Sequence, residues 1–423
     1  MTAFGILDKY SLGVGDRFGQ EGEAQLRALD LARTSGVSVT PVWNKSHREH
    51  SIIGSTPAET RIAVDKAVRN AAWKAPYYVD ADHINLKSVD HFISSCDFFT
   101  IDVADYIGRP AEPADVAAYC DAVKEFQGQL TVPGLKDPLD IADQDIQEIA
   151  KKYLWPVKEA GRIYRRIRSA KGETPFVTEV SFDEAFEPQT PEDLFFILAA
   201  IAQEGIPVQT VAPKFSGKFL KGIDYVGSTD DFAREFEDDL HVIAFAIRKF
   251  GLPTSLKISV HSGSDKFSLY PLIRSAIRKL DAGLHLKTAG TTWLEEVIGL
   301  ATSGGEGLAL AKTIYRRAHG KVAEICKPYE SVIDINMERL PAPRTVDTWS
   351  GTEFAAELRH DPSNPSYNLH FRQLLHVAYG VAAEMKEEYL DVLARNREIV
   401  ASNVSENLWT RHLKPLFIGP GTA

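Results

Sequence analysis

The chain has few cysteines and no cysteine pair at metal-binding or redox spacing. Its 423 residues include three cysteines, Cys96, Cys120 and Cys326, which lie far apart in the sequence. A disulfide framework and a CxxC zinc or redox site both need paired or closely spaced cysteines. The sequence therefore excludes a disulfide-stapled scaffold and favours buried free thiols.

Long apolar runs are also missing. The first residues, MTAFGILDKYSLGVGDRFG, lack the basic flank, the apolar core and the cleavage site of a signal peptide. No later stretch reaches the roughly 18 consecutive apolar residues of a membrane helix. We therefore expect a cytoplasmic protein without a membrane partner.

Positive charge is in deficit. The formal net charge is −10 and the sequence pI is about 5.7, so no general basic field exists to hold nucleic acid. Charged residues make up 25% and hydrophobic residues 44% of the chain, as in soluble globular proteins. We expect a small-molecule partner, and an anionic one would need locally placed Lys or Arg. The composition is compatible with a homo-oligomer.

Two common catalytic signatures are absent. Gly13, Gly15 and Gly19 follow the spacing GxGxxxG rather than the GxGxxG of a dinucleotide site, and Asp and Arg stand between them. The serines lack the strand–turn–helix setting of a nucleophile elbow. These patterns disfavour a nucleotide cofactor and a serine hydrolase.

The sequence does contain a repeated unit, in which a short apolar run is followed by polar residues and then by an amphipathic helical stretch. Eight such runs begin near Leu12, Val37, Pro76, Phe98, Phe176, Val208, Ser255 and Gly283. This alternation predicts an α/β fold, a (β/α)₈ barrel of the TIM type. A doubly wound open sheet would produce the same local alternation and stays an alternative.

Two segments depart from the repeat. Residues of about 106–174 form an insertion rich in charged helical sequence, and residues 301–423 carry long helical patterns interrupted by proline-rich stretches. We expect a barrel over residues 1–300 that includes the insertion, and a helical C-terminal extension that packs on the barrel. The arginines of RIYRRIRS within the insertion are expected to form a solvated helix face.

Polar side chains cluster where the expected strands end. His261 and His285 close the last two strands, which would be neighbours at one rim of the barrel. Glu179 ends the fifth strand, where Asp183 and Glu184 follow it, and Asp82 shares an inward face with Asp80 in the third. Buried charge of this kind needs a partner or a metal ion. Two imidazoles with nearby carboxylates predict a divalent metal site.

Lysines at strand ends suggest the kind of substrate. Lys45, Lys214, Lys257 and Lys287 lie at or near such ends in an otherwise acidic chain, so we expect them, with His83 and Asp265, to bind a carboxylate or a polyhydroxylated molecule. A Schiff-base lysine is the competing interpretation.

Other side chains are less informative. His47 and His50 fall in an expected loop, and His370 and His376 fall in helical sequence, where packing is expected unless the extension folds over the barrel mouth. Trp293, beside the last strand, is expected to help close that mouth.

Six segments resemble the tagaturonate epimerase family over most of the chain, from about Ser11 to Trp409. They are, in order, GVGDRFGQEGEAQL, VDADHINL, APKFSGKFLKGIDYVG, KISVHSGSDKFSLYP, HLKTAGTTWLEE and RQLLHVAYGVAAEM. Members of this family are metal-dependent enzymes that interconvert tagaturonate and fructuronate, and some relatives accept the neutral ketoses tagatose and fructose.

The resemblance implies a divalent metal, such as Zn, Mn, Ni or Co, together with an acid/base pair. Carried over to this sequence, the family pattern falls on Asp82 and Glu179 as acid and base, and on His261, His285 and Glu179 as metal ligands. Carbon 4 of a 2-ketose is β to the ketone, so its proton is not acidic and simple enolisation cannot invert it. A retro-aldol cleavage between carbons 3 and 4, followed by re-addition, can.

Two alternatives remain open at this stage. A metal-dependent aldolase would use the same groups but release the fragments, and a non-catalytic sugar-binding barrel would use them for recognition alone.

Overall fold

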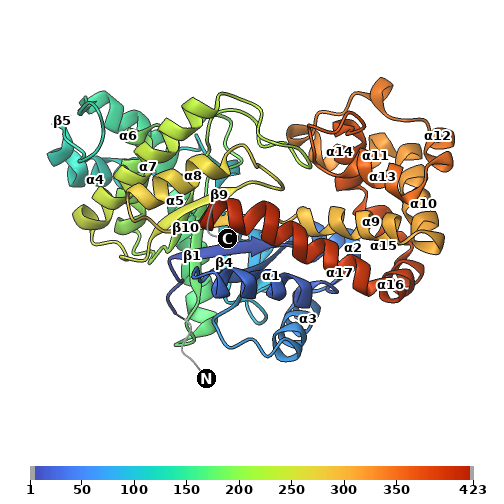
Figure 1. Ribbon diagram of the computed structural model, residues 1–423. Helices are drawn as coiled ribbons and strands as arrows, with labels where there is room; N and C mark the ends of the chain where they lie inside the picture. Colours follow the sequence, from blue (N-terminus) through green and yellow to red (C-terminus); the bar gives the residue numbers. More distant parts are fainter. Residues whose placement is uncertain (1–4, 420–423) are drawn as a thin grey trace.

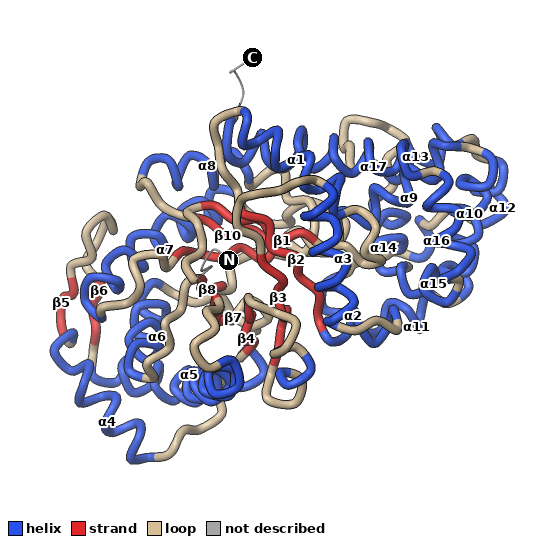
Figure 2. The backbone as a smooth tube through the Cα atoms, turned by 90° about the horizontal axis from the view of Figure 1, so that it is seen from below, coloured by secondary structure: helices blue, strands red, loops and turns tan. Residues whose placement is uncertain are grey.

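Eight parallel strands close into a barrel. The computed structural model describes residues 5–419, and the strands follow one another around the barrel in the order β1-β10-β9-β8-β7-β4-β3-β2. They are β1 (Tyr10–Val14), β2 (Thr40–Ser46), β3 (Tyr78–Ile84), β4 (Phe98–Asp102), β7 (Val177–Ser181), β8 (Thr210–Ala212), β9 (Lys257–His261) and β10 (Leu284–Lys287). The fold is therefore a (β/α)₈ barrel, and the open-sheet alternative does not apply. Figures 1 and 2 show the strands enclosed by helices.

Helices follow the strands on the outside of the barrel. They are α1 (Gly22–Thr34), α2 (His47–Ile53), α3 (Pro57–Asn70), α5 (Asp143–Lys171), α6 (Pro191–Gln203), α7 (Thr229–Phe250), α8 (Tyr270–Lys279) and α9 (Thr291–Ser303). The local sequence determines where α3 and α6 begin. Thr56 and Thr190 each precede a proline and form a capping box with the acidic residue three positions later. A single-turn segment, η1 (Val89–His91), follows β3.

The strands bury both faces, as parallel strands in barrels do. Outward residues such as Val79 and Ala81 join the main core beneath the helices, whereas Val42, Tyr78, Phe98 and Val177 form a separate cluster inside the barrel with Leu7. This apolar plug fills the lower interior. Polar side chains occupy the levels above it, toward the carboxyl ends of the strands.

The segment between β4 and β7 contains one of the barrel's own helices. Its first part holds η2 (Ala104–Tyr106), α4 (Pro113–Val123), η3 (Lys124–Phe126) and an antiparallel pair, β5 (Gly128–Leu130) and β6 (Leu139–Ile141). The rest is α5, which packs against α6 and β4 as a barrel helix does. The four arginines of RIYRRIRS pair with carboxylates, some of them buried and some exposed; the arginines are Arg162, Arg165, Arg166 and Arg168.

The C-terminal extension is helical and lies beyond the carboxyl ends of the strands (Figure 1). It comprises α10 (Gly305–Gly320), α11 (Val322–Cys326), η4 (Lys327–Val332), η5 (Met337–Arg339), α12 (Pro343–Thr348), α13 (Gly351–Leu358), α14 (Leu369–Val377), α15 (Tyr379–Glu384), α16 (Lys386–Arg395) and α17 (Arg397–Glu406). These helices have their own hydrophobic cluster, to which α9 contributes Trp293, Leu294 and Val297. The last helix of the barrel thus also anchors the extension.

The chain then returns to the barrel. A π-helical segment, η6 (Asn407–Ile418), packs on α1 and α8, and its residues Leu413 and Leu416 belong to the barrel's core. Arg274 and Arg278 of α8 donate hydrogen bonds to its last carbonyls. The extension is therefore held to the barrel at both of its ends.

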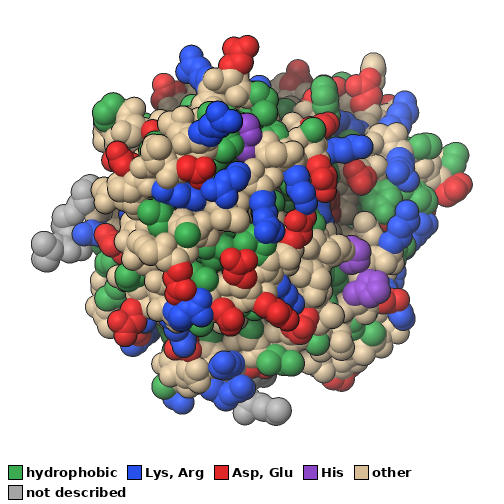
Figure 3. All heavy atoms as spheres, turned by 90° about the vertical axis from the view of Figure 1, so that its right-hand side faces the viewer, with side chains coloured by type: hydrophobic (Ala, Val, Ile, Leu, Met, Phe, Trp, Pro, Cys, Tyr) green, Lys and Arg blue, Asp and Glu red, His purple; other side chains and the backbone are tan. Residues whose placement is uncertain are grey.

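No helix within residues 5–419 combines the length and the apolarity that crossing a bilayer requires. The face that carries the extension mixes basic and acidic side chains without a broad field of either sign (Figure 3).

Candidate active site

A bulge in β3 opens the site. The pairing of β3 with β4 changes register between Ala81 and Ile84, and His83 within it has a φ of 50°. Positive φ is uncommon for a residue other than glycine, and such strain gathers at functional sites. Regular alternation would point Asp82 and His83 to opposite faces, but the bulge brings both side chains to the mouth of the barrel.

Lys287 lies among three carboxylates. Its Nζ is 2.9 Å from oxygens of Asp80, Asp82 and Glu179, and all four side chains are buried. The neighbouring carboxylates overcome the effect of burial and raise the pKa of Lys287 well above its usual value. The ammonium is therefore charged and cannot serve as a Schiff-base nucleophile in this state.

The same lysine sets the charge of its partners. Burial alone would raise the pKa of Asp82, but Lys287, His83 and His261 lower it to about 2. Burial raises the pKa of Asp80 to about 6, because Lys287 offsets it only in part. Asp82 is thus ionised at neutral pH. Its carboxylate lies at the rim, whereas Asp80 lies one pair of residues deeper.

His261 is held between two carboxylates. Its Nε2 is 2.8 Å from Glu179 Oε1, and its Nδ1 is 3.0 Å from Asp183 Oδ2. Burial lowers the pKa of this imidazole, but Asp183 and Glu179 together outweigh that effect and raise it to about 9. Asp183 is oriented in turn by the hydroxyl of Ser181, which donates a hydrogen bond to it.

His83 completes the cluster. Its ring centroid is 5.2 Å from that of His261, and its Nδ1 is 3.1 Å from Asp102. Ligand atoms of His83, Asp183 and His261 all lie within 4.8 Å of one another. Because Asp102 occupies Nδ1 of His83, Nε2 is the nitrogen left for a ligand.

These donors fit a divalent transition metal. Two imidazole nitrogens and one carboxylate oxygen are a common ligand set for Zn, Mn, Ni or Co, and three protein ligands leave a position for substrate. Glu179 Oε2 is buried close by and has no hydrogen-bond partner among residues 5–419. The site thus offers three preorganised ligands and a spare carboxylate oxygen.

The structure places His285 below this cluster. Lys287 pairs with His261 across β10 and β9, whereas His285 pairs with Ser259. Two residues along a strand correspond to roughly 6–7 Å. The ring packs 5.2 Å from Phe98 in the apolar plug, and its Nδ1 is 2.8 Å from Ser11 Oγ. Burial lowers its pKa to about 3. His285 is a neutral interior histidine that lies outside the group of ligand atoms within 4.8 Å of one another, although it is near enough to Glu179 to affect the pKa of that carboxyl.

Lys257 lies at the opposite end of the barrel. It is the first residue of β9, and its Nζ donates hydrogen bonds to the carbonyls of Leu7 and Asp8. His261, four residues later, ends the same strand at the mouth. The two residues are therefore separated by the height of the barrel, and Lys257 cannot contact a substrate bound at the histidines.

Asp265 is buried beneath the mouth rather than exposed in it. Its carboxylate accepts hydrogen bonds from Arg372 at 2.6 Å and from Thr291 at 2.9 Å, and it lies 3.1 Å from His360 Nδ1. Thr291 starts α9 and Arg372 belongs to α14. Asp265 thus ties the β9 loop to both of these helices and has no free oxygen for substrate.

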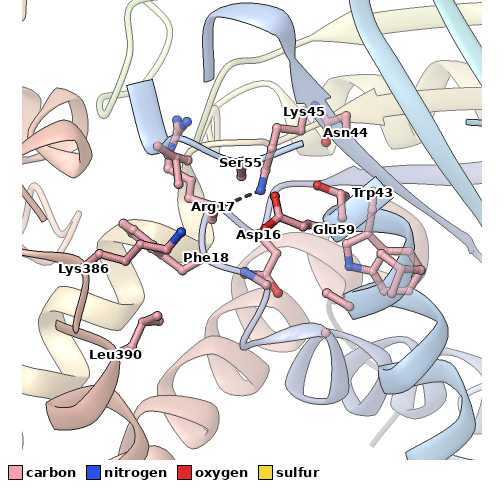
Figure 4. Close-up of a pocket in the computed structure, with 16 residues that line it drawn as sticks. Asp16, Arg17, Phe18, Trp43, Asn44, Lys45, Ser55, Glu59, Lys386 and Leu390 are labelled. Carbon is pink, nitrogen blue, oxygen red and sulfur yellow. Dashed lines mark hydrogen bonds between the residues drawn. The ribbon is translucent and has the colours of Figure 1, made fainter. Parts of the chain in front are cut away.

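Lys45 points out of the barrel wall. Its neighbour in the ladder, Ala81, belongs to the outer core. The Lys45 ammonium donates a hydrogen bond to the Arg17 carbonyl in a cavity of about 170 Å³, which Lys386 and Leu390 of α16 close on the other side (Figure 4). This cavity is separate from the His83, Asp183 and His261 cluster.

Lys214 follows β8. Its backbone N–H donates a hydrogen bond to the side-chain oxygen of Gln189, which fixes the position of the backbone. Within the described residues its ammonium has no ion pair.

The comparisons with known proteins identify the family. The family model described as UxaE, tagaturonate epimerase, matches residues 5–416. The chain belongs to the tagaturonate epimerase family. It is an epimerase, and thus an isomerase. A relative from Thermotoga maritima, described as a tagaturonate/fructuronate epimerase, is 28% identical over 420 residues, which cover 95% of this chain and 80% of that protein.

Solved epimerase structures share the fold. A glycerol-bound crystal structure of the fructuronate-tagaturonate epimerase from Cohnella laeviribosi matches with a TM-score of 0.80 at 23% identity, over 98% of this chain and 82% of that one. The native crystal structure of the same enzyme matches with a TM-score of 0.78. At this level of identity the similarity concerns the barrel and its helical extension.

Proposed function

We propose that this epimerase interconverts tagaturonate and fructuronate by inverting carbon 4 with the help of a divalent metal ion. The observation that carries the proposal is the convergence of His83, Asp183 and His261 at the barrel mouth, in a chain of this family. Beside them lie Lys287 and the carboxylates that surround its ammonium. The relative from Thermotoga maritima is named for its action on these two hexuronates.

His83, Asp183 and His261 would hold the metal. Asp102 fixes the ring of His83 and Glu179 that of His261, which is the support that metal-bound histidines usually have. A bound divalent ion acts as a Lewis acid that stabilises negative charge developing on substrate oxygens. Glu179 Oε2 is available as a further ligand or as a base.

The protein's own groups would manage the proton. The carbon-4 hydrogen is not acidic and the sequence disfavours a dinucleotide cofactor, so the proposed route is cleavage of the bond between carbons 3 and 4, which starts when a base takes the proton of the carbon-4 hydroxyl. Asp82 is ionised and lies at the rim, so we assign it this role. Glu179, with its unpartnered oxygen, is the candidate group for returning a proton.

Lys287 links these two carboxylates. The separation between Asp82 and Glu179 is smaller than expected from the sequence, because a single strand, β4, lies between theirs and both carboxylates contact the same ammonium. An ammonium at this position stabilises an alkoxide during cleavage and lets a proton pass between the carboxylates. The acid/base pair therefore acts as one linked group rather than from opposite sides of the barrel.

The reaction is tested by following the label at carbon 4. Metal-loaded protein is incubated with tagaturonate and with tagatose, and the products are separated by chromatography. Substrate deuterated at carbon 4 should give epimer with the label retained, since that hydrogen never leaves its carbon. Washout of the label would reject the retro-aldol route, accumulated three-carbon fragments would indicate an aldolase, and binding without turnover would indicate a sugar-binding protein.

A further inference from the structure

Two turns at the barrel mouth carry backbone N–H groups without acceptors. They are turn 262–264, after β9, and turn 288–290, between β10 and α9. Among residues 5–419, no acceptor is present for the N–H groups of Gly263, Ser264 and Ala289. The turns touch each other, because Gly290 donates a hydrogen bond to the Gly263 carbonyl. These are the loops after the seventh and eighth barrel strands, where such barrels commonly bind anions.

Lys221 brings an uncompensated positive charge to the same place. It lies in the loop after β8, and a Cβ added at Gly263 would fall 3.9 Å from its Nζ. Within the described chain the ammonium has neither a hydrogen-bond acceptor nor a carboxylate within 4 Å, and it lies 5.6 Å from the ring centroid of Tyr329. Both Lys221 and Gly263 remain partly exposed. This cation is thus free to pair with a ligand.

His376 of α14 approaches from the extension. It is 1% exposed, and neither ring nitrogen has a hydrogen-bond partner in the described part of the chain. A Cβ added at Gly290 would fall 1.8 Å from its Nε2, so the ring lies directly against that turn. A buried imidazole without any partner is costly in a finished core. Its position indicates that a bound ligand supplies the missing hydrogen-bond partner of the ring.

A rigid support holds the two turns together. Asp265 follows the first turn directly and accepts a hydrogen bond from Thr291, which follows the second. The Arg372 guanidinium, one turn before His376 on α14, binds the same carboxylate and the Gly222 carbonyl next to Lys221. The three elements that present Lys221, His376 and the free N–H groups are therefore joined through one buried ion pair.

We propose that Lys221, the free backbone N–H groups of turns 262–264 and 288–290, and His376 form a subsite for the carboxylate of a hexuronate. Gly263 is two residues beyond His261, so a carboxylate bound there lies within the length of a six-carbon substrate from the candidate metal ligands. This inference rests on the proposed epimerase function and adds the group that selects an acidic over a neutral sugar.

The subsite also suits the chemistry. After cleavage between carbons 3 and 4, the aldehyde fragment comprises carbons 4 to 6, with the carboxylate at carbon 6. Rotation about the bond between carbons 4 and 5 turns the aldehyde over while the carboxylate stays in place. An anchored carboxylate thus retains the fragment and limits its motion to the rotation that inversion needs.

The test compares Lys221→Met with Lys218→Met, an exposed lysine of the same loop. For Lys221→Met we expect KM for tagaturonate to rise by at least about tenfold, the scale of one charge-assisted hydrogen bond. Turnover of tagatose should change little, Lys221→Arg should recover most of the affinity, and Lys218→Met should resemble the wild type. Equal losses on both sugars, or no loss on either, would overturn the subsite.

A second measurement does not depend on activity or on a folded variant. Glycerate mimics the fragment of carbons 4 to 6, and glycerol is its uncharged counterpart. Glycerate, but not glycerol, should slow amide hydrogen exchange in residues 262–266 and 288–293 of the wild-type protein. Protection by glycerate without turnover of either sugar would contradict the proposed function but support the anion subsite. Turnover without protection would support the proposed function but contradict the anion subsite.

Discussion

The Nε2 atom of His261 lies 2.8 Å from Oε1 of Glu179, and this contact fixes how the imidazole is presented. Glu179 is fully buried on β7 and cannot rotate away, so the ring's other nitrogen must face Asp183 at the mouth. The pair thus gives a strand-end histidine a fixed orientation, which suits a candidate metal ligand. It also explains why Asp183, in the loop beyond β7, is a better partner for His261 than His285, which lies one layer deeper in the barrel.

Metal binding should distinguish the two candidate ligand sets. Asp183→Asn removes a charged donor from the cluster and should weaken metal affinity by about 10- to 100-fold or more. His285 lies in the layer below, so His285→Gln should leave metal stoichiometry unchanged. Metal content after dialysis, measured by mass spectrometry, checks both. Loss of metal in His285→Gln with retention in Asp183→Asn would restore the ligand set predicted from the sequence.

Lys287→Met should unfold more easily than the wild type. The substitution leaves Asp80, Asp82 and Glu179 buried without their common cation, and breaking a buried ion pair costs about 3–5 kcal/mol. Urea unfolding at neutral pH measures the change. Lys279→Met, which breaks an exposed pair with Glu237, should cost less than about 1 kcal/mol. Equal stability of the two variants would show that the carboxylates are not ionised together.

Stability should rise with pH because of Lys257. Burial lowers the pKa of this lysine from 10.5 to about 8 in the folded protein. Between these values the unfolded chain binds a proton that the folded chain releases, so the free energy of unfolding increases from about pH 8 to about pH 10. The gain amounts to about 3 kcal/mol. Below pH 8 the full cost of the buried charge is present.

The contribution of Lys257 is isolated by comparing urea unfolding of Lys257→Met and of Lys249→Met, an exposed lysine on α7, across this pH range. The first variant should lose the increase and the second should keep it. An unchanged pH profile in Lys257→Met would mean that other groups cause the increase.

Trp293→Ala should act on stability rather than on the barrel mouth. The indole is fully buried in the extension's cluster, and its Nε1 donates a 2.7 Å hydrogen bond to the Leu375 carbonyl. It therefore joins α9 to α14 instead of lying over the mouth. Its removal should cost about 3–5 kcal/mol, whereas Trp155→Ala, at a partly exposed position on α5, should cost less. Thermal unfolding measures both; a normal melting temperature with leaking fragments would contradict this interpretation.

The sequence was sufficient to predict the strands and favoured a barrel, but the same alternation also allowed an open sheet, and the pairing of β1 with β10 decides between them. Each strand is a short apolar run followed by polar residues, and periodicity also placed Asp82, Glu179 and Lys287 on inward faces. These three residues do meet. The depth of a residue along its strand was harder to predict: Lys257 and His261 share a face, but four residues span about 13 Å, which places them at opposite ends of the barrel.

Three features of the site had no local signal. The bulge at His83 depends on a backbone conformation that residue type alone does not reveal. Asp183 lies beyond its strand, where periodicity no longer applies. His376 comes from a helix that is nearly a hundred residues away from β10 in the sequence, and only the docking of the extension brings it to Gly290.

The closure of β1 against β10 has a consequence for how the protein forms. The first strand pairs with residues 284–287, so it must wait until two-thirds of the chain has been synthesised before its free edge is covered. Such distant pairings make folding slow and leave the early strands open to chaperones or to aggregation. Asp265 waits longer still, since Arg372 emerges after it by more than a hundred residues. Ribosome-bound intermediates should therefore lack the candidate metal cluster until the strand at residues 284–287 closes the barrel, and the proposed anion subsite until α14 has been synthesised.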